Sequence, residues 1–171
     1  MKPIIMLDMD GVISDFISVY NAVTPPIDSK EKFYDAVRVH RIFEKLPLLP
    51  NAKKLLSLLF DELKVEVQIL SSMGTYNKEV AMQVAAQKTK WLHMHSINAS
   101  KLNFVHSWSL KENYSSPRMI MIDDRSDVIA QFIKHGGLGV LYDDAKFDTI
   151  KHEIIENVEL IRNSAKAEVV V

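Results

Sequence analysis

Short apolar runs alternate along this chain with longer segments that carry apolar residues at helical spacing. The first run, at residues 4–7, is continuously apolar and leads directly into Asp8, which is typical of a strand buried on both faces of a parallel sheet. Further candidate strands follow at residues 65–70, 102–106, 118–122 and 138–142. This alternation of strand and helix predicts an α/β domain built on a doubly wound, parallel sheet with five strands, one for each run.

Residues 16–49 interrupt the alternation directly after the first strand. The segment contains a helix break at Thr24-Pro25-Pro26 and a predicted helix over residues 30–45. It is too short to bury a full core of its own. We therefore expect a small helical cap inserted into a Rossmann-like core that is made of residues 1–15 and 50–171.

Composition narrows the class of protein. A hydrophobic content of 47% over 171 residues is enough for one domain with a buried core. The net charge of −1 gives no general attraction to nucleic acid or to an anionic membrane. The absence of cysteine excludes disulfides and thiolate metal sites. No apolar run has the length of a signal peptide or a membrane span, so we expect a cytoplasmic protein. Residues 165–171 fit an edge strand or a disordered tail equally well.

Polar side chains cluster where three of the predicted strands end. The clusters are Asp8 with Asp10 after the first strand, Ser71 with Ser72 after the second, and Asp123 with Asp124 after the fourth. In a doubly wound sheet, ligands bind outside the carboxyl ends of the strands, near the point where the strand order reverses. Each cluster alone also fits a turn or a helix N-cap. Together on one rim they predict a binding site.

The first cluster indicates which kind of ligand to expect. Asp8 and Asp10 point the same way from extended backbone, because side chains alternate along a strand. Like charges this close persist where a cation lies between them or where one of them is protonated. Carboxylate oxygens, without cysteine or clustered histidine, suit a hard cation, and we expect Mg²⁺.

These motifs resemble those of the haloacid dehalogenase superfamily of phosphohydrolases. The first motif matches Asp8-Met9-Asp10-Gly11-Val12, the second Ser71 and the third Lys111, while the fourth matches Asp123-Asp124 with Arg125 and Asp127. The stretch Ile122-Asp123-Asp124-Arg125, with Trp91-Leu92 between motifs, is similar to the branch that contains the 5′(3′)-deoxyribonucleotidases. The chain departs from that branch in its insertion, which is shorter than the helical cap of those relatives.

The resemblance implies a role for each motif residue. Asp8 would be the nucleophile that forms an aspartyl-phosphate, and Asp10 the general acid for the leaving alcohol and then the base for water. Mg²⁺ would be held by Asp8, by the backbone carbonyl of Asp10 and by one carboxylate of the Asp123-Asp124 pair. Which of these two residues is the direct ligand is left open. Ser71, Ser72 and Lys111 would bind the phosphoryl oxygens, with Lys101 as the competing choice for the lysine. Arg125 and Asp127 also fit a surface ion pair without a further role.

The predicted activity is that of a Mg²⁺-dependent phosphatase acting on a small phosphomonoester, best matched by a nucleoside 5′-monophosphate. Phe16, Tyr20 and Phe33 of the insertion are candidate substrate contacts, and the apolar seam of a cap explains them as well. The alternatives are a phosphatase of terminal phosphates on nucleic acid or of another phosphometabolite, and a non-catalytic module that binds a phosphorylated ligand. The near-neutral charge disfavours stable binding to nucleic acid. The sequence leaves the oligomeric state open.

Overall fold

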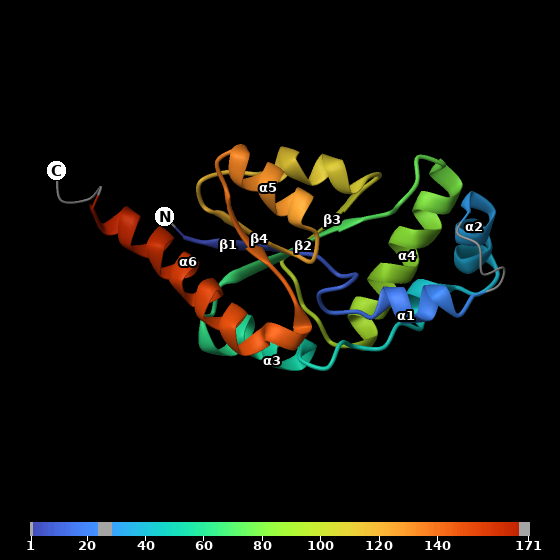
Figure 1. Cartoon of the computed structure of the whole chain (residues 1–171), viewed down its shortest axis with the longest axis horizontal. Helices are drawn as coiled ribbons and strands as arrows, with labels where there is room; N and C mark the ends of the chain where they lie inside the picture. The colour runs from blue at the N-terminus through green and yellow to red at the C-terminus, as the bar shows by residue number, and fades with distance from the viewer. Residues whose placement is uncertain (1, 24–28, 168–171) are drawn as a thin grey trace.

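The computed structural model describes residues 2–23 and 29–167. Its centre is a five-stranded sheet in the order β3-β2-β1-β4-β5, in which every pair of neighbours is parallel (Figure 1). The strands are β1 (Ile4–Leu7), β2 (Glu66–Ser72), β3 (Lys101–Val105), β4 (Met119–Asp123) and β5 (Leu138–Leu141). This confirms the predicted fold class. The strand order reverses beside β1, because β2 and β4 pair with its two edges.

Helices cover both faces of the sheet. They are α1 (Phe16–Asn21), α2 (Lys30–Arg38), α3 (Ala52–Ser57), α4 (Lys78–Met94), α5 (Ser126–Lys134) and α6 (Phe147–Ala167). Shorter helical turns are η1 (Ile42–Glu44), η2 (Leu58–Glu62), η3 (Trp108–Tyr114) and η4 (Asp144–Lys146). The apolar residues of β1 alternate between two separate clusters. β1 is therefore buried on both sides, as its continuous apolar run requires.

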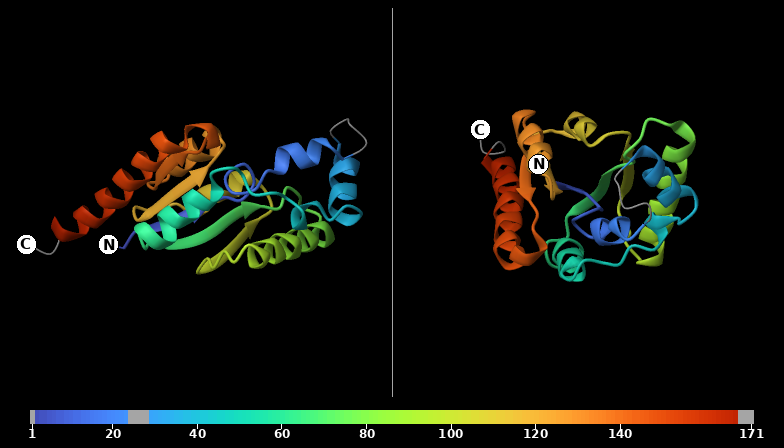
Figure 2. Two further views of the ribbon diagram at one scale, coloured as in Figure 1. Left: turned by 90° about the horizontal axis from the view of Figure 1, so that it is seen from below. Right: turned by 45° about the vertical axis from the view of Figure 1, so that its right-hand side comes forward.

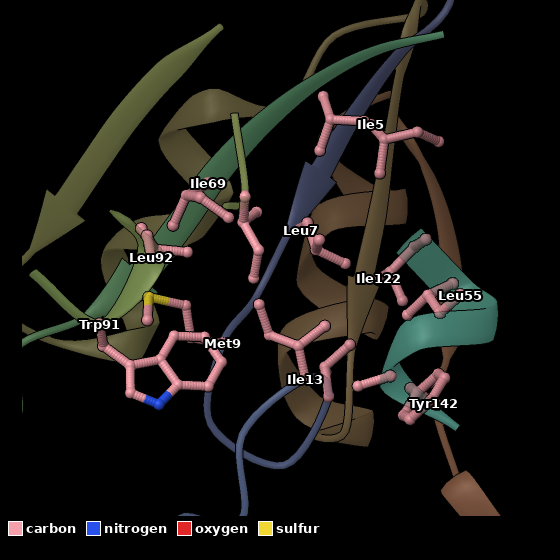
Figure 3. Packing of buried hydrophobic residues seen from close by; sticks show 14 of the residues in the cluster. Ile5, Leu7, Met9, Ile13, Leu55, Ile69, Trp91, Leu92, Ile122 and Tyr142 are labelled. Atoms are coloured by element: carbon pink, nitrogen blue, oxygen red, sulfur yellow. The ribbon is translucent and has the colours of Figure 1, made fainter. Parts of the chain in front are cut away.

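The larger cluster fills the face that α3, α4 and α6 cover (Figure 3). Ile5 and Leu7 of β1 belong to this cluster together with Leu55 of α3, and Met9 lies beside Trp91 of α4. Ile4 and Met6 point to the opposite face, where α5 supplies Phe132 and its neighbours. Because both faces are fully covered, the unpaired ends of the strands are where the sheet can expose polar side chains.

The described parts of the insertion, residues 16–23 and 29–49, lie beyond the carboxyl ends of the strands and pack on α4 (Figures 1 and 2). The predicted helix break at Thr24-Pro25-Pro26 lies outside the described residues. The predicted helix over residues 30–45 is wrong in its second half, because α2 ends at Arg38 and Arg41 has a left-handed φ of 49°. The turn directs Ile42 and Phe43 into the core, where they are buried. Burial of these two side chains outweighs the local preference for a longer helix.

Residues 165–167, the described part of the C-terminal segment, continue as helix rather than as an edge strand. Helix α6 extends to Ala167, and residues 168–171 lie outside the described residues. Over residues 2–23 and 29–167, no helix has both the length and the apolar character needed to cross a membrane.

Candidate active site

The carboxyl ends of β1 and β4 bring two acidic segments together at the reversal of strand order. Asp8 follows β1, and its backbone N–H donates to the carbonyl of Ile122 at 3.0 Å, which continues the pairing with β4. Asp123 ends β4, and Asp124 follows it. Carboxylate oxygens of Asp8, Asp123 and Asp124 lie within 4.8 Å of one another. The parallel register thus produces the convergence that the sequence predicted for these residues.

A buried lysine links two of these carboxylates. Lys111 lies in η3, is 1% exposed, and its Nζ is 2.7 Å from Oδ2 of both Asp8 and Asp123. Burial by itself lowers the pKa of the Lys111 ammonium, but the two carboxylates outweigh this effect and raise the pKa above its ordinary value. Lys101, the competing candidate, lies exposed at the start of β3. The structure therefore places Lys111, and not Lys101, against Asp8.

The adjacent acids of β4 have different surroundings. Asp123 is fully buried, with Oδ1 accepting from the backbone N–H of Arg125 at 2.9 Å and Oδ2 accepting from Lys111. Asp124 is exposed, and its carboxyl group lies against Gly11, whose φ is +80°. Each oxygen of Asp123 accepts one hydrogen bond, and the same is true of both oxygens of Asp8. What distinguishes Asp124 is its exposure, which makes it the more accessible member of the pair for a metal ion.

The acidic cluster carries more negative charge than its single lysine offsets. Loss of hydration, followed by the nearby Asp8 carboxylate, raises the pKa of Asp123 and raises the pKa of Asp124 to about 6. A divalent cation between these groups would relieve the repulsion. Carboxylate ligands alone fit a hard cation such as Mg²⁺, so the donor set agrees with the predicted metal.

Asp10 is held from both sides at the entrance to the cluster. Its Oδ2 lies 2.7 Å from Nζ of Lys88, and its Oδ1 accepts from Oγ of Ser14 at 3.2 Å. Burial raises the pKa of Asp10 above its ordinary value, with a contribution from Asp8, although Lys88 acts in the opposite direction. A carboxyl group with a raised pKa is suited to donating a proton near neutral pH.

Lys88 is the site residue that the sequence analysis missed. It belongs to α4 and is fully buried, and its Nζ donates to Oδ2 of Asp10, to Oγ of Ser71 at 2.8 Å and to the backbone carbonyl of Ser72 at 2.9 Å. The signal was its spacing: it follows Val84 by four positions and precedes Trp91 by three, so it lies on the buried stripe of the helix. A lysine on a buried stripe needs a negative partner.

The two serines after the second predicted strand have different environments. Ser71 is fully buried, and its hydroxyl oxygen accepts from Lys88. Ser72 lines the cavities described below, and its hydroxyl accepts from the backbone N–H of Gly74 at 3.0 Å. Of the pair, Ser72 is therefore the residue that faces an incoming ligand.

Two neighbouring cavities meet at Asp10. The larger, of about 500 Å³, is lined by aromatic rings of the insertion. These are the predicted Phe16, Tyr20 and Phe33, together with Phe43, which the sequence analysis did not single out. The ring of Phe16 stacks on Tyr20 and Phe43 at centroid distances of 5.0 and 5.4 Å. The insertion thus forms an apolar wall beside the acidic cluster.

The smaller cavity, of about 220 Å³, opens over the acidic cluster itself. Its lining includes Asp8, Lys111 and Asp124, with Trp108 and Arg125 at the rim. The Arg125 guanidinium lies 4.3 Å from the ring centroid of Trp108 and pairs with Asp127 at 2.7 Å on the surface. The surface ion pair that the sequence suggested for Arg125 and Asp127 is therefore present.

The chain matches no protein-family model, and no curated protein is significantly similar to it. Similar solved structures include an uncharacterized protein from Corynebacterium glutamicum, with 14% identity, 93% of this chain and 96% of that chain covered, and a TM-score of 0.48. L-2-haloacid dehalogenase from Xanthobacter autotrophicus has 12% identity, coverages of 81% and 76%, and a TM-score of 0.48. A hydrolase from Streptococcus pneumoniae has 16% identity, coverages of 84% and 94%, and a TM-score of 0.45. Similarity at this level does not identify the reaction, so the function has to be inferred from the residues of the site.

Proposed function

We propose that this chain is a hydrolase of the haloacid dehalogenase superfamily and that it removes phosphate from a small phosphomonoester through an aspartyl-phosphate. The observation that supports this most strongly is the convergence of Asp8, Asp10, Lys111 and Asp124 on one cavity. Phosphoryl transfer to a carboxylate needs a nucleophile, a proton for the leaving oxygen and positive charge near the phosphoryl oxygens. Each of these needs has a candidate side chain in this cavity.

In the first step, a carboxylate oxygen of Asp8 forms a bond to phosphorus while the bond from phosphorus to the alcohol oxygen breaks. The Lys111 ammonium, at 2.7 Å from Asp8, fixes the orientation of the nucleophile. Asp10 gives its proton to the leaving oxygen, and its raised pKa keeps that proton available. In the second step, Asp10 takes a proton from the water that attacks phosphorus, and Asp8 is released together with inorganic phosphate.

Asp8, Asp124 and the backbone carbonyl of Asp10 are the groups that would hold Mg²⁺. The ion would supply positive charge to the phosphoryl oxygens. The hydroxyl of Ser72 faces the same cavity and is a candidate donor to these oxygens.

The preferred substrate in this proposal is a nucleoside 5′-monophosphate. The aromatic cavity of about 500 Å³ begins at Asp10, so it lies where the alcohol part of the ester would project. Rings such as Phe16 and Phe33 offer faces and edges on which a nucleobase can pack. A phosphatase of nucleic-acid ends and a phosphatase of another metabolite remain the alternatives that the same assay tests. The cytoplasmic location stays a prediction.

Hydrolysis of a carbon–halogen bond would fit the same nucleophile less well. A halide leaves as an anion and needs no proton, so Asp10 would have no role. A haloacid also carries no phosphate, so a cation held by the cluster of three acids would have no phosphoryl oxygens to bind.

The test is phosphate release by the purified protein from a panel of nucleotides, sugar phosphates and phosphorylated oligonucleotides, with Mg²⁺ and with EDTA. We expect turnover of nucleoside 5′-monophosphates that requires Mg²⁺ and that Asp8→Asn abolishes. Asp148→Asn, an exposed carboxylate outside the site, is the matched control and should leave turnover unchanged. Release of chloride from 2-chloropropionate without release of phosphate from any ester would refute the proposal.

A further inference from the structure

Lys88 is a buried charge to which the proposed reaction assigns no role. It is 0% exposed, and its Nζ makes contacts of 2.7, 2.8 and 2.9 Å to Asp10 Oδ2, Ser71 Oγ and the Ser72 carbonyl. An ammonium group has three N–H donors and no acceptor. All of its donors therefore have partners, and the direction of each hydrogen bond is fixed.

These hydrogen bonds determine how the neighbouring groups are oriented. Asp10 is held at Oδ2 by Lys88 and at Oδ1 by Ser14, so its carboxyl plane cannot rotate without breaking a contact. Because the ammonium cannot accept, the Ser71 oxygen accepts from Lys88 and keeps its own hydrogen for another acceptor. Lys88 thus sets the orientation of the proposed acid group and of a serine on the neighbouring strand.

The same turn of α4 also anchors the insertion. Gln87 Nε2 donates to the backbone carbonyl of Val37 at 2.8 Å, and Trp91 Nε1 donates to that of Leu46 at 2.7 Å. Nζ of Lys88 itself lies 4.8 Å from the ring centroid of Phe43, which lines the aromatic cavity. Hydrogen bonds to the insertion therefore come from Gln87, directly before Lys88, and from Trp91, three positions after it.

We propose that Lys88 is a positioning residue. It holds the Asp10 carboxyl group at the edge of the aromatic cavity, where the leaving alcohol of the substrate would lie. This inference rests on the proposed phosphatase function and adds to it a residue that acts through Asp10. Lys88 lines neither cavity and is closed off from solvent, so it does not contact the substrate. Its effect is to place a proton donor at the oxygen of the leaving group.

The variant Lys88→Met keeps most of the apolar side chain and removes the ammonium. The readout is the rate of aspartyl-phosphate formation in single turnovers on two esters, one with an alkyl leaving group and one with p-nitrophenolate. A p-nitrophenolate ion leaves without a proton, so a displaced Asp10 should slow only the alkyl ester, by about 10²-fold. Water attack also needs Asp10, so p-nitrophenyl phosphate should show a burst stoichiometric with the enzyme and then slow turnover. With the alkyl ester, kcat should fall much more than KM rises.

Two further variants separate this role from a purely structural one. Lys90→Met, two positions along the same helix, removes an exposed ion pair with Glu44 and should leave both rates unchanged. Asp10→Asn should reproduce the selective loss on the alkyl ester. Adding Lys88→Met to Asp10→Asn should then cause no further loss, because the two changes act through one group.

A chemical rescue covers the case in which Lys88→Met folds poorly. The chain contains no cysteine, so Lys88→Cys can be alkylated at a single position with 2-bromoethylamine in denaturant and refolded. The product carries an ammonium on a chain that has sulfur in place of one methylene. Recovery of the alkyl-ester rate in this product, with wild type taken through the same treatment as the control, is the expected result.

Three outcomes would overturn the inference. The first is an equal loss on both esters with an unchanged melting temperature, and the second is an additive loss in the double variant. The third is an alkylated Lys88→Cys protein that refolds but does not regain the alkyl-ester rate. If wild type releases phosphate from no ester, the proposed function itself fails and the inference fails with it. An active wild type with an unimpaired Lys88→Met variant refutes the inference alone.

Discussion

Replacing Gly11 by alanine would insert a methyl group into the contact between the loop after β1 and Asp124. A Cβ atom at residue 11 would lie 2.5 Å from Cγ of Asp124 and closer still to its Oδ2. Carbon atoms in contact are normally about 3.5–4.0 Å apart. The Asp124 carboxyl group would therefore have to move by about 1 Å from its present position in the oxygen cluster that we assign to Mg²⁺.

The expected magnitudes differ for stability and for metal binding. Gly11 has a φ of +80°, and an alanine in this left-handed region costs about 1–2 kcal/mol in folding free energy. The clash adds little, because the carboxyl group is the end of a flexible side chain and can rotate away. Mg²⁺ requires near-ideal octahedral geometry. A ligand displaced by about 1 Å should therefore lower the apparent affinity for Mg²⁺, or kcat/KM, by about 10²-fold.

Gly136→Ala provides a matched control for the backbone strain. Gly136 also has a positive φ, of +93°, but a Cβ there would meet no atom within 4 Å. Both variants should lose about 1–2 kcal/mol, which corresponds to roughly 2–4 °C in Tm per kcal/mol for a domain of this size. Only Gly11→Ala should need more Mg²⁺ for activity. The assays are thermal unfolding with and without Mg²⁺ and the dependence of phosphate release on Mg²⁺ concentration.

A Gly11→Ala protein that needs no more Mg²⁺ than Gly136→Ala would refute the reasoning. That result would mean that Asp124 does not hold the ion, or that its position against Gly11 is unimportant. A loss of stability in Gly11→Ala far beyond that of Gly136→Ala would show instead that the Asp124 side chain cannot rotate away.

Other predictions concern pH, the buried lysine and the aromatic cavity. The pKa of Asp124 is raised to about 6 by partial loss of hydration of its carboxyl group against the loop after β1 and by Asp8, so Mg²⁺ affinity should rise with pH through about 6, as calorimetry on either side of that pH would show. Between pH 3.8 and about 6, Asp124 keeps its proton in the folded, metal-free chain but has lost it in the unfolded chain. The unfolding free energy of the metal-free protein should therefore fall as pH rises through this range. Lys111→Met leaves buried carboxylates unpaired and should cost about 3–5 kcal/mol in urea unfolding, whereas the exposed Lys101→Met should cost little. Phe33→Ala should raise KM for a nucleotide roughly 2- to 12-fold, with kcat for p-nitrophenyl phosphate unchanged; an equal effect on both would argue against base packing.

Local sequence was sufficient to predict the fold class and most of the acidic site. The continuously apolar run of β1 and the alternation of strand and helix follow from burial, which acts on each segment through its own pattern. Asp8 and Asp123 could be predicted to meet because both end parallel strands, and parallel strands present their carboxyl ends at one edge. The motif spacing supplied the remaining candidates, Lys111 and the paired serines.

Contacts between distant parts of the chain decided the rest. Lys88 is 78 residues from Asp10 in sequence, and only the packing of α4 against the sheet brings the two side chains to 2.7 Å. The difference between Asp123 and Asp124 likewise depends on which of them Lys111 reaches. Sequence determines which segments become strands and helices, because hydrophobic periodicity is a local property. The pairing of buried charges depends on the three-dimensional arrangement, because a buried ammonium is stable only where folding has placed acceptors around it.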